Sequence, residues 1–323
     1  MIVVVMVVSI IASWVAVRAL LPQLTRAGVV GRDIHKPAMP QVPEMGGIAM
    51  IMGFTAGLLM SVGLLSFFHS FPTANLTALL AALGTVLAAG LIGLVDDLLS
   101  IHQGVKAVLP VLAAIPLMAI RAGDAAMIIP FLGPVDLWIF YPLLVVPSSV
   151  TVAANAVNML AGFNGLEAGL GIVAMASLSA IAWQLGETTA LILLLSGIGS
   201  LLGILPFNWY PAKVFVGDVG TLTIGTIIAA AVIIGDFEVA GLILLIPYGV
   251  DFLLKAAHRF PSTGWGGTLR GDGRLHCPAH GPVGLCQLVM RVTGGIRERT
   301  LVLLLMGLEA VLGLVAVSLY VFR

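Results

Sequence analysis

Long apolar runs, separated by short polar segments, dominate this chain. The first charged side chain is Arg18, and apolar runs of similar length recur up to the C-terminus. Continuous apolar runs of about twenty residues are typical of membrane-spanning helices, whereas barrel strands alternate apolar and polar positions. The pattern predicts an all-α polytopic membrane protein. Its transmembrane helices number about ten and are expected at about residues 1–22, 45–67, 75–95, 105–121, 137–155, 166–184, 187–206, 217–234, 238–257 and 300–321.

The composition supports this interpretation. Hydrophobic residues make up 60% of the 323 residues and charged residues only 9%, with a mean hydropathy of +1.13. A soluble domain carries about 25% charged residues. The net charge of zero gives no indication of nucleic-acid binding. No basic segment precedes the first apolar run, so we expect a span there rather than a cleaved signal. Without a repeat or a change in composition, one integral membrane domain is expected over residues 1–323.

Basic residues indicate which side of the membrane each connection faces. If the spans alternate in direction, Arg121 and Arg323 lie on one side, which leaves thirteen of the 15 Lys and Arg residues on the other. Cytosolic loops of membrane proteins carry such an excess of basic residues. We therefore expect both termini outside the cell and the basic connections in the cytosol.

The cytosolic connections also hold most of the ligand-type side chains. These connections are residues 31–47, 95–106, 155–169, 208–218 and the longest loop, 258–299. A transporter places its key polar groups near the middle of the membrane. The concentration on one face favours an enzyme with its active-site groove at the cytosolic surface, and an ion-coupled transporter is the alternative from another class.

Two adjacent aspartates, Asp96 and Asp97, end the apolar run of the third span. Neighbouring carboxylates repel each other, and desolvation at a membrane boundary adds to that cost. A divalent cation or a cationic partner is expected to offset it, and the pair could bind Mg²⁺, which prefers a few carboxylates together with water and phosphate oxygens. One of the pair could also act as a base, and an ordinary acidic loop is the alternative. Lys106 is either a phosphate clamp or a positive-inside anchor.

Two further segments offer oxygen ligands. Asn158 shares a helix face with Asn155, and Gly162 lies in a glycine-rich stretch where the backbone can approach a ligand. Asn158 and Asn164 could present an amide to a metal or a nucleobase, or they could form hydrogen bonds between helices. Asp218 opens another span, either as a helix N-cap or as a metal ligand together with Asn158 and the aspartate pair.

The loop 258–299 is rich in basic residues. They include Arg270, Arg274, His276, His280, Arg291, Arg297 and Arg299. Guanidinium groups match phosphate oxygens, so such a cluster suits a diphosphate, and binding of anionic lipid headgroups is the alternative. In the ninth span, Asp251 lies near Lys255 and indicates an internal ion pair rather than catalysis.

Five segments together resemble the polyprenyl-phosphate N-acetylhexosamine-1-phosphate transferase family. They are GRDIHKPAMPQVPEMGG (31–47), GLVDDLLSIHQGVK (93–106), NAVNMLAGFNGLEAG (155–169), NWYPAKVFVGD (208–218) and GGIRERTL (294–301). The resemblance covers nearly the full chain. Ala161-Gly162 stands where bacterial relatives usually have Asp-Gly, which favours the UDP-GlcNAc–dolichyl-phosphate branch of eukaryotes and archaea.

The resemblance implies a ten-helix bundle that transfers GlcNAc-1-phosphate from UDP-GlcNAc to a polyprenyl phosphate of the dolichyl type, releasing UMP. A different UDP-N-acetylhexosamine, such as UDP-MurNAc-pentapeptide, is the alternative donor. The implied cofactor is Mg²⁺, with Mn²⁺ as a substitute, and the partners are these substrates and the membrane. Whether the protein forms a homodimer stays open. The compact loops favour a prokaryotic, archaeal cell membrane.

The resemblance also implies roles for individual residues. It places Asn158 and Asp218 on the metal, Asp96 and Asp97 in the paired acidic motif, and Lys106 and Glu44 near the phosphates. Positions around uridine are Ile34, Gly162, Asn164 and Phe215. His280 matches a histidine of the sugar-recognition loop, but the arginines that flank it in the eukaryotic branch are Ala279 and Gly281 here. Arg270 or Arg274 is expected to replace them.

Overall fold

The computed structural model describes residues 1–129, 133–261 and 263–321, so Arg323 lies outside the described residues. In that part of the chain, eight helical segments are long and apolar enough to cross a membrane. They are α1 (Ile2–Arg26), α2 (Gly47–Phe68), α3 (Leu76–Leu99), the π-helical turn η1 (Tyr141–Val145) continued by α7 (Val146–Met159), α8 (Leu166–Leu185), α9 (Thr188–Asn208), α10 (Gly217–Ile234) and α14 (Glu298–Val321). The polytopic helical fold is confirmed.

The described residues do not confirm the count of ten spans. A ninth is formed if α11 (Glu238–Leu244) and α12 (Ile246–Ala257), which are bent by 55° relative to each other, cross the membrane together. The span predicted at 105–121 is a series of short helices, α4 (Gln103–Val108), α5 (Pro110–Ala113) and α6 (Ile115–Ala119). Pro110 and Pro116 each lack the N–H that would continue the helical ladder, so the apolar run breaks twice.

Short antiparallel hairpins and one further helix occupy the connections. The hairpins pair β1 (Val30–Arg32) with β2 (Gln41–Pro43), β3 (Ala126–Ile129) with β4 (Gly133–Asp136), and β5 (Thr268–Leu269) with β6 (Leu275–His276); the helix is α13 (Leu285–Val292). In the first hairpin Gly31 lies opposite Val42. The all-α prediction therefore holds for the bundle and misses these small sheets.

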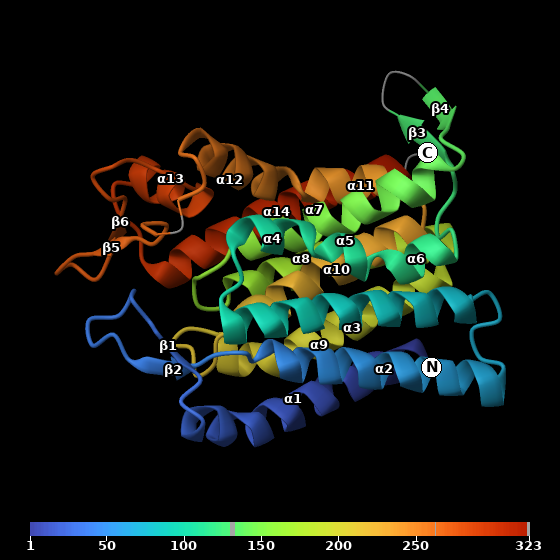
Figure 1. Ribbon diagram of the computed structural model, residues 1–323, viewed down its shortest axis with the longest axis horizontal. Coiled ribbons are helices and arrows are strands. Elements are labelled where there is room, and N and C mark those ends of the chain that lie inside the picture. The colour runs from blue at the N-terminus through green and yellow to red at the C-terminus, as the bar shows by residue number, and fades with distance from the viewer. Residues whose placement is uncertain (130–132, 262, 322–323) are drawn as a thin grey trace.

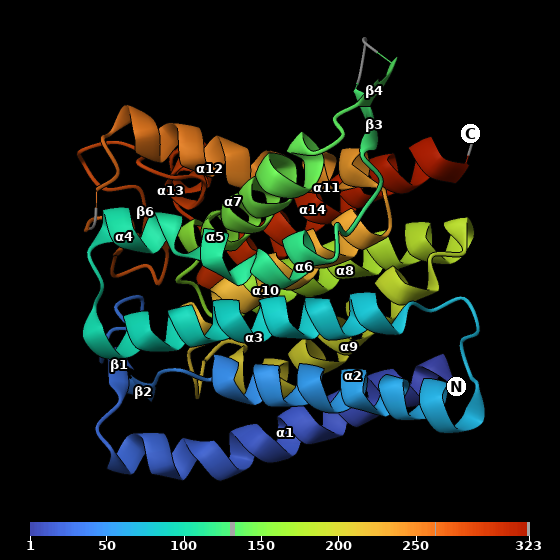
Figure 2. The same cartoon turned by 45° about the vertical axis from the view of Figure 1, so that its right-hand side comes forward.

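The polar connections gather at one end of the bundle. The hairpins β1–β2 and β5–β6 and helix α13 lie at the left in Figures 1 and 2, whereas α1 begins and α14 ends at the right. Helix α10 runs through the middle and contacts α3, α7 and α9. It is the most buried of the long helices, with 83% of its apolar window inside the protein. Its first turn, at the polar end, is therefore well placed to organise a site.

Gly93 allows α3 to approach the first turn of α10 closely. A Cβ atom at Gly93 would lie 2.5 Å from the backbone oxygen of Asp218 and 2.5 Å from the Cα of Val219. No side chain fits at such distances without moving one helix. The close approach of the two backbones brings the end of α3 and the start of α10 together.

The substitution Gly93→Ala is expected to lower both stability and activity. Overpacking costs about 1–3 kcal/mol, which exceeds the gain of about 1 kcal/mol in helix propensity. Thermal unfolding in detergent and turnover would measure both effects. Gly84→Ala is the matched control on the same helix, because its Cβ would meet only the Pro116 side chain at 3.4 Å. Equal behaviour of the two variants would contradict the close-packing argument.

Candidate active site

Four of the predicted residues converge at the polar end of the bundle. The Lys106 ammonium lies 2.5 Å from a carboxylate oxygen of Asp96 and also forms an ion pair with Asp218. The side-chain amide of Asn158 donates to the other oxygen of Asp218 at 2.5 Å. Residues from α3, α4, α7 and α10 thus meet at one carboxylate. The structure therefore brings these four predicted residues together, and their roles stay predictions.

Asp97 lies beside this group but faces a different partner. Its Oδ1 accepts the backbone N–H of Asp218 at 2.9 Å, and its Oδ2 accepts that of Val219 at 3.1 Å. Both oxygens therefore satisfy unpaired N–H groups at the start of α10, where a negative charge is favoured. The N-cap interpretation of Asp218 is wrong: the helix begins at Gly217, and the capping carboxylate comes from Asp97 on α3.

The arrangement suits a hard divalent cation. Carboxylates of Asp96 and Asp218 point at a common position, and the ammonium of Lys106 lies between them. The amide oxygen of Asn158 accepts no hydrogen bond from the described residues. Two carboxylates and an amide oxygen match the oxygen ligands of Mg²⁺. The donor set therefore fits the cofactor that the sequence predicts.

The segment before α2 lies against the start of α10. Backbone N–H groups of Gly46 and Gly47 donate to the carbonyls of Phe215 and Val216, both at 2.8 Å, and Phe215 donates to Pro43 at 2.8 Å. Asp96, Lys106, Asn158 and Asp218 are called the central group below. The backbone bonds bring Glu44 and Phe215, two predicted substrate residues, to the edge of this group. Burial and then the Asp218 charge raise the pKa of the Glu44 carboxyl.

A second charged cluster, which the sequence did not assign, lies among buried residues. Lys36 lies 3.0 Å from Asp33 and 2.5 Å from Glu298, at the start of α14. Predicted Asn164 joins it, with its backbone N–H donating to Glu298 at 2.8 Å and its side-chain amide donating to Asp33 at 3.2 Å. In the sequence, these three charged residues stood out only because they lie in motifs that carry the family resemblance, within a chain that is poor in charge.

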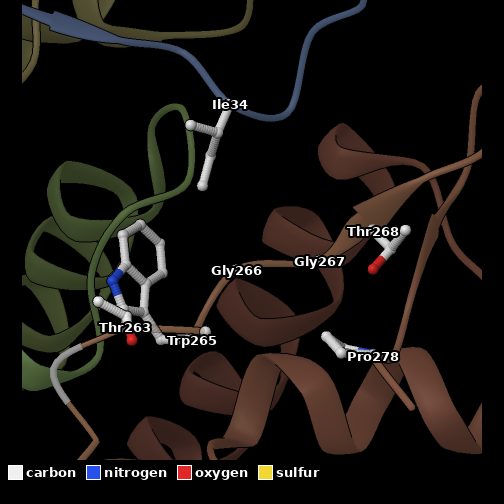
Figure 3. Close-up of a pocket in the computed structure, with 8 residues that line it drawn as sticks. Ile34, Thr263, Trp265, Gly266, Gly267, Thr268 and Pro278 are labelled. Carbon is white, nitrogen blue, oxygen red and sulfur yellow. The ribbon is translucent and has the colours of Figure 1, made fainter. Parts of the chain in front are cut away.

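Predicted Ile34 lines a cavity next to this cluster, and predicted Gly162 packs against Trp265, another residue of the cavity wall. The cavity, of about 410 Å³, is lined by Ile34, Thr263–Thr268 and Pro278, and Figure 3 shows the indole of Trp265 on the side facing Ile34. A Cβ at Gly162 would lie 2.4 Å from that indole, so the glycine backbone packs directly against Trp265. Trp265 was not predicted, because one aromatic residue in a long loop carries no local signal.

His35 stacks on Phe163 with ring centroids 4.5 Å apart, and its Nε2 accepts the backbone N–H of Gly267 at 3.2 Å. These contacts tie the loop 258–299 to the segment before α2. Burial lowers the pKa of His35 from 6.5 to about 4. The ring is therefore neutral at physiological pH and able to accept the hydrogen bond.

Stability is expected to fall on acidification between these two pKa values. Below pH 6.5 the unfolded chain binds a proton at His35, whereas the folded chain stays neutral until about pH 4. His35→Gln has no titrating ring, so the wild type should lose thermal stability relative to this variant as the pH falls from 7 to 5. A constant difference in melting temperature over that range would contradict the assignment.

The loop residues Arg270, Arg274 and His280 lie apart from the central group. Both arginines are exposed at the turn between β5 and β6, where the Arg270 N–H donates to the Arg274 carbonyl at 3.0 Å. Among the described residues neither arginine forms a salt bridge. His280 is exposed and lies near Gly264 at the cavity, with its Nδ1 3.1 Å from the Gly281 carbonyl. Their roles stay predictions.

Known sequences share this chain's pattern. The sequence profile of glycosyl transferase family 4 matches residues 79–236. A protein of Saccharolobus solfataricus, provisionally named UDP-N-acetylglucosamine–dolichyl-phosphate N-acetylglucosaminephosphotransferase, is 38% identical over 97% of this chain and 94% of its own length. The chain belongs to glycosyl transferase family 4. The Dictyostelium discoideum protein of that transferase name is 29% identical over 79% of this chain and 69% of its own.

The family resemblance and its branch are thus confirmed. A phospho-N-acetylmuramoyl-pentapeptide-transferase of Enterococcus faecalis is 32% identical but covers a smaller share, 59% of this chain. In this family 4 glycosyl transferase the profile spans α3 to the end of α10. It includes Asp96, Lys106, Asn158 and Asp218 and leaves out both the segment between α1 and α2 and Glu298.

Proposed function

We propose that this protein transfers GlcNAc-1-phosphate from UDP-GlcNAc to a polyprenyl phosphate of the dolichyl type, giving polyprenyl-PP-GlcNAc and UMP. Such a reaction is the first membrane step of glycan assembly, as in N-glycosylation. The observation that carries the proposal is the convergence of Asp96, Lys106 and Asn158 on Asp218 in a chain whose archaeal and eukaryotic relatives bear this transferase name.

The reaction joins an oxygen of the lipid phosphate to the β-phosphorus of UDP-GlcNAc. The bond from that phosphorus to the bridging oxygen breaks, and UMP leaves with the bridging oxygen and its electron pair. Phosphoryl transfer needs charge neutralisation and in-line positioning more than covalent chemistry by the protein. The lipid phosphate is already largely anionic at neutral pH, so a strong general base is not obligatory.

The site residues are assigned to the metal ion, the phosphates and the sugar. Asn158 and Asp218, with the Asp96 carboxylate beside them, would hold Mg²⁺ or Mn²⁺, which would supply a Lewis acid for the β-phosphate and the departing UMP. Lys106 contributes a positive charge to the phosphate oxygens, and Glu44 is assigned to the same phosphates. Arg270 and Arg274 are assigned to the diphosphate and His280 to the sugar.

The uridine end is assigned to the neighbouring surface. Ile34, Gly162 and Asn164 come together around the second cluster and the adjoining cavity, and Phe215 lies at the edge of the central group. The polyprenyl tail would extend from the central group between the helices. This placement leaves the reacting phosphates next to Lys106 and Asp218.

The active site is assigned to the cytosolic face and both termini to the outside. The basic residues concentrate on the connections at the site's end of the bundle. The location is proposed to be an archaeal, or other prokaryotic, cell membrane, because the loops are compact and two archaeal relatives match most of the chain. Accessibility of cysteines introduced at Gly28 and Gly186 in intact cells would test the sidedness.

Release of UMP by the purified protein tests the proposed function. The assay supplies polyprenyl phosphate and, in parallel, UDP-GlcNAc, UDP-GalNAc and UDP-MurNAc-pentapeptide, and mass measurement identifies the lipid product. Preferential turnover of UDP-GlcNAc supports the proposal, and preference for another donor replaces it with the rival transferase. Ion transport in liposomes without turnover of any donor would refute an enzyme.

Removal of divalent cations is expected to abolish UMP release. Two carboxylates and an amide oxygen form the candidate site, so Mg²⁺ or Mn²⁺ added in excess should restore turnover. Thermal unfolding of the EDTA-treated protein serves as the control, because an unchanged melting temperature shows that the protein stays folded. Full turnover in EDTA would contradict the metal assignment.

A further inference from the structure

The buried cluster of Asp33, Lys36 and Glu298 connects two ends of the sequence. Lys36 follows the first helix and Glu298 opens the last one, 262 residues later, yet the ammonium and carboxylate are 2.5 Å apart. Their exposed fractions are only 9% and 5%, and that of Asp33 is 3%. Charged groups so deeply buried are rare in proteins unless they are paired, as all three are here.

The cluster determines the position of Asn164. This residue lies in a turn between Gly162 and Gly165, whose positive φ angles of 103° and 83° interrupt any helix. Its backbone N–H donates to Glu298 and its side-chain N–H to Asp33, and its side-chain oxygen accepts the Ala212 N–H at 2.7 Å. Partners from three distant segments therefore hold one turn that has few hydrogen bonds of its own.

The same cluster determines how Ile34 is presented. Its neighbours Asp33, His35 and Lys36 are buried, whereas Ile34 itself is 45% exposed and lines the cavity opposite Trp265 (Figure 3). Three buried anchors around one exposed residue leave that residue little freedom to move. Both Ile34 and the Gly162–Asn164 turn are thus fixed relative to each other through Asp33.

A metal ion is not needed to explain the cluster. Ligand atoms of Asp33, His35 and Glu298 lie within 4.8 Å of one another, which resembles a metal site. The Lys36 ammonium, however, already pairs with both carboxylates, and it also lies over the Tyr210 ring at 4.3 Å. The positive charge that two buried carboxylates require is therefore supplied by the chain itself.

We infer that Asp33, Lys36 and Glu298 are positioning residues that set the affinity for the nucleotide part of the sugar donor. The inference rests on the proposed function, which assigns Ile34, Gly162 and Asn164 to uridine. Without Lys36, two buried carboxylates repel, and the segment before α2 or the Asn164 turn moves away. Binding of the nucleotide then weakens, whereas the lipid phosphate, held at the central group, is not affected.

Lys36→Met, Glu298→Gln and the double variant test the inference. Lys36→Met leaves two unpaired carboxylates and should raise the KM for UDP-GlcNAc and the Kd for UMP about tenfold. Glu298→Gln keeps an oxygen for the Asn164 N–H and should raise them about threefold. The double variant removes one positive and one negative charge, so its effect should be smaller than that of Lys36→Met. Such non-additivity would show that the two residues are energetically coupled.

The KM for polyprenyl phosphate separates positioning from general destabilisation. It should stay within about twofold of the wild-type value in all three variants, because the lipid phosphate binds elsewhere. Arg26→Met is the matched control: it removes an exposed cation at the same end of the bundle and should change neither KM. A parallel rise of both KM values, or a double variant worse than Lys36→Met, would overturn the inference.

The milder variant keeps the test decisive if Lys36→Met does not fold. Titration of UMP into Glu298→Gln and wild-type protein then gives the answer, and equal affinities would overturn the inference. This titration also separates the inference from the proposed function. A wild type that releases no UMP from UDP-GlcNAc refutes the proposed function. The titration needs no turnover, and it overturns the inference if the variants bind UMP as tightly as the wild type.

Discussion

Replacing Asp218 with asparagine is expected to reduce UMP release at least about a hundredfold. The carboxylate of Asp218 pairs with Lys106 and accepts a hydrogen bond from the Asn158 amide, so both contacts of α10 with the central group depend on it. The variant keeps the shape of the side chain and removes its charge. Initial rates over a range of Mg²⁺ concentrations would show whether excess metal restores any turnover.

Asp236→Asn is the matched control for this substitution. Asp236 follows the other end of α10, and its carboxylate accepts the Asp124 N–H at 2.6 Å, far from the central group. The same chemical change there should leave turnover unchanged. Similar losses in both variants would mean that α10 responds to any lost carboxylate, and the special role of Asp218 would have to be abandoned.

The spans could be predicted because each apolar run carries its own signal. The third span shows the limit of that signal: the sequence predicts 75–95, but α3 continues to Leu99 and contains both aspartates. Hydropathy places charged residues outside the membrane helix. The helix continues because Lys106 pairs with Asp96 and the N–H groups of α10 bind Asp97, partners that the local sequence cannot reveal.

Ion pairs within one helix are easier to predict from the sequence than pairs between residues far apart in the chain. Asp251 and Lys255 are one helical turn apart, and the predicted internal pair is confirmed at 2.8 Å. Helix periodicity alone places such side chains on one face. Lys36 and Glu298 are 262 positions apart, so only the packing of α14 against the segment between α1 and α2 could bring them together. The same reason explains why Trp265 was missed.

The sequence identified the residues of the candidate site but not which of them contact each other. The motifs name Asp96, Lys106, Asn158 and Asp218, and the structure brings all four together. The oxygen-rich segments suggested that Asn158 and Asp218 lie near the aspartate pair, and the family resemblance added Lys106. The close approach of α3 to α10 determines which carboxylate pairs with Lys106 and which one caps α10. In the sequence, Gly93 does not reveal which helix it allows to approach.

Asp97→Asn is expected to reduce turnover by about 10- to 100-fold and to raise the Mg²⁺ concentration needed for half-maximal activity. Both oxygens of Asp97 accept N–H groups at the start of α10, and asparagine can replace only one of these acceptors. Loss of such a cap costs about 0.5–2 kcal/mol. The first turn of α10 then shifts, and Asp218, which it carries, no longer faces Asn158 and Lys106 correctly.

The pH dependence of turnover distinguishes this positioning role from that of a general base. A base that must be ionised produces the acidic limb of the pH–rate profile, and asparagine in its place removes that limb. A helix cap does not exchange protons with the substrate, so Asp97→Asn should keep the acidic limb at a lower plateau. Loss of the limb with an unchanged Mg²⁺ dependence would instead establish Asp97 as the base, because the metal-binding carboxylate would then be undisturbed.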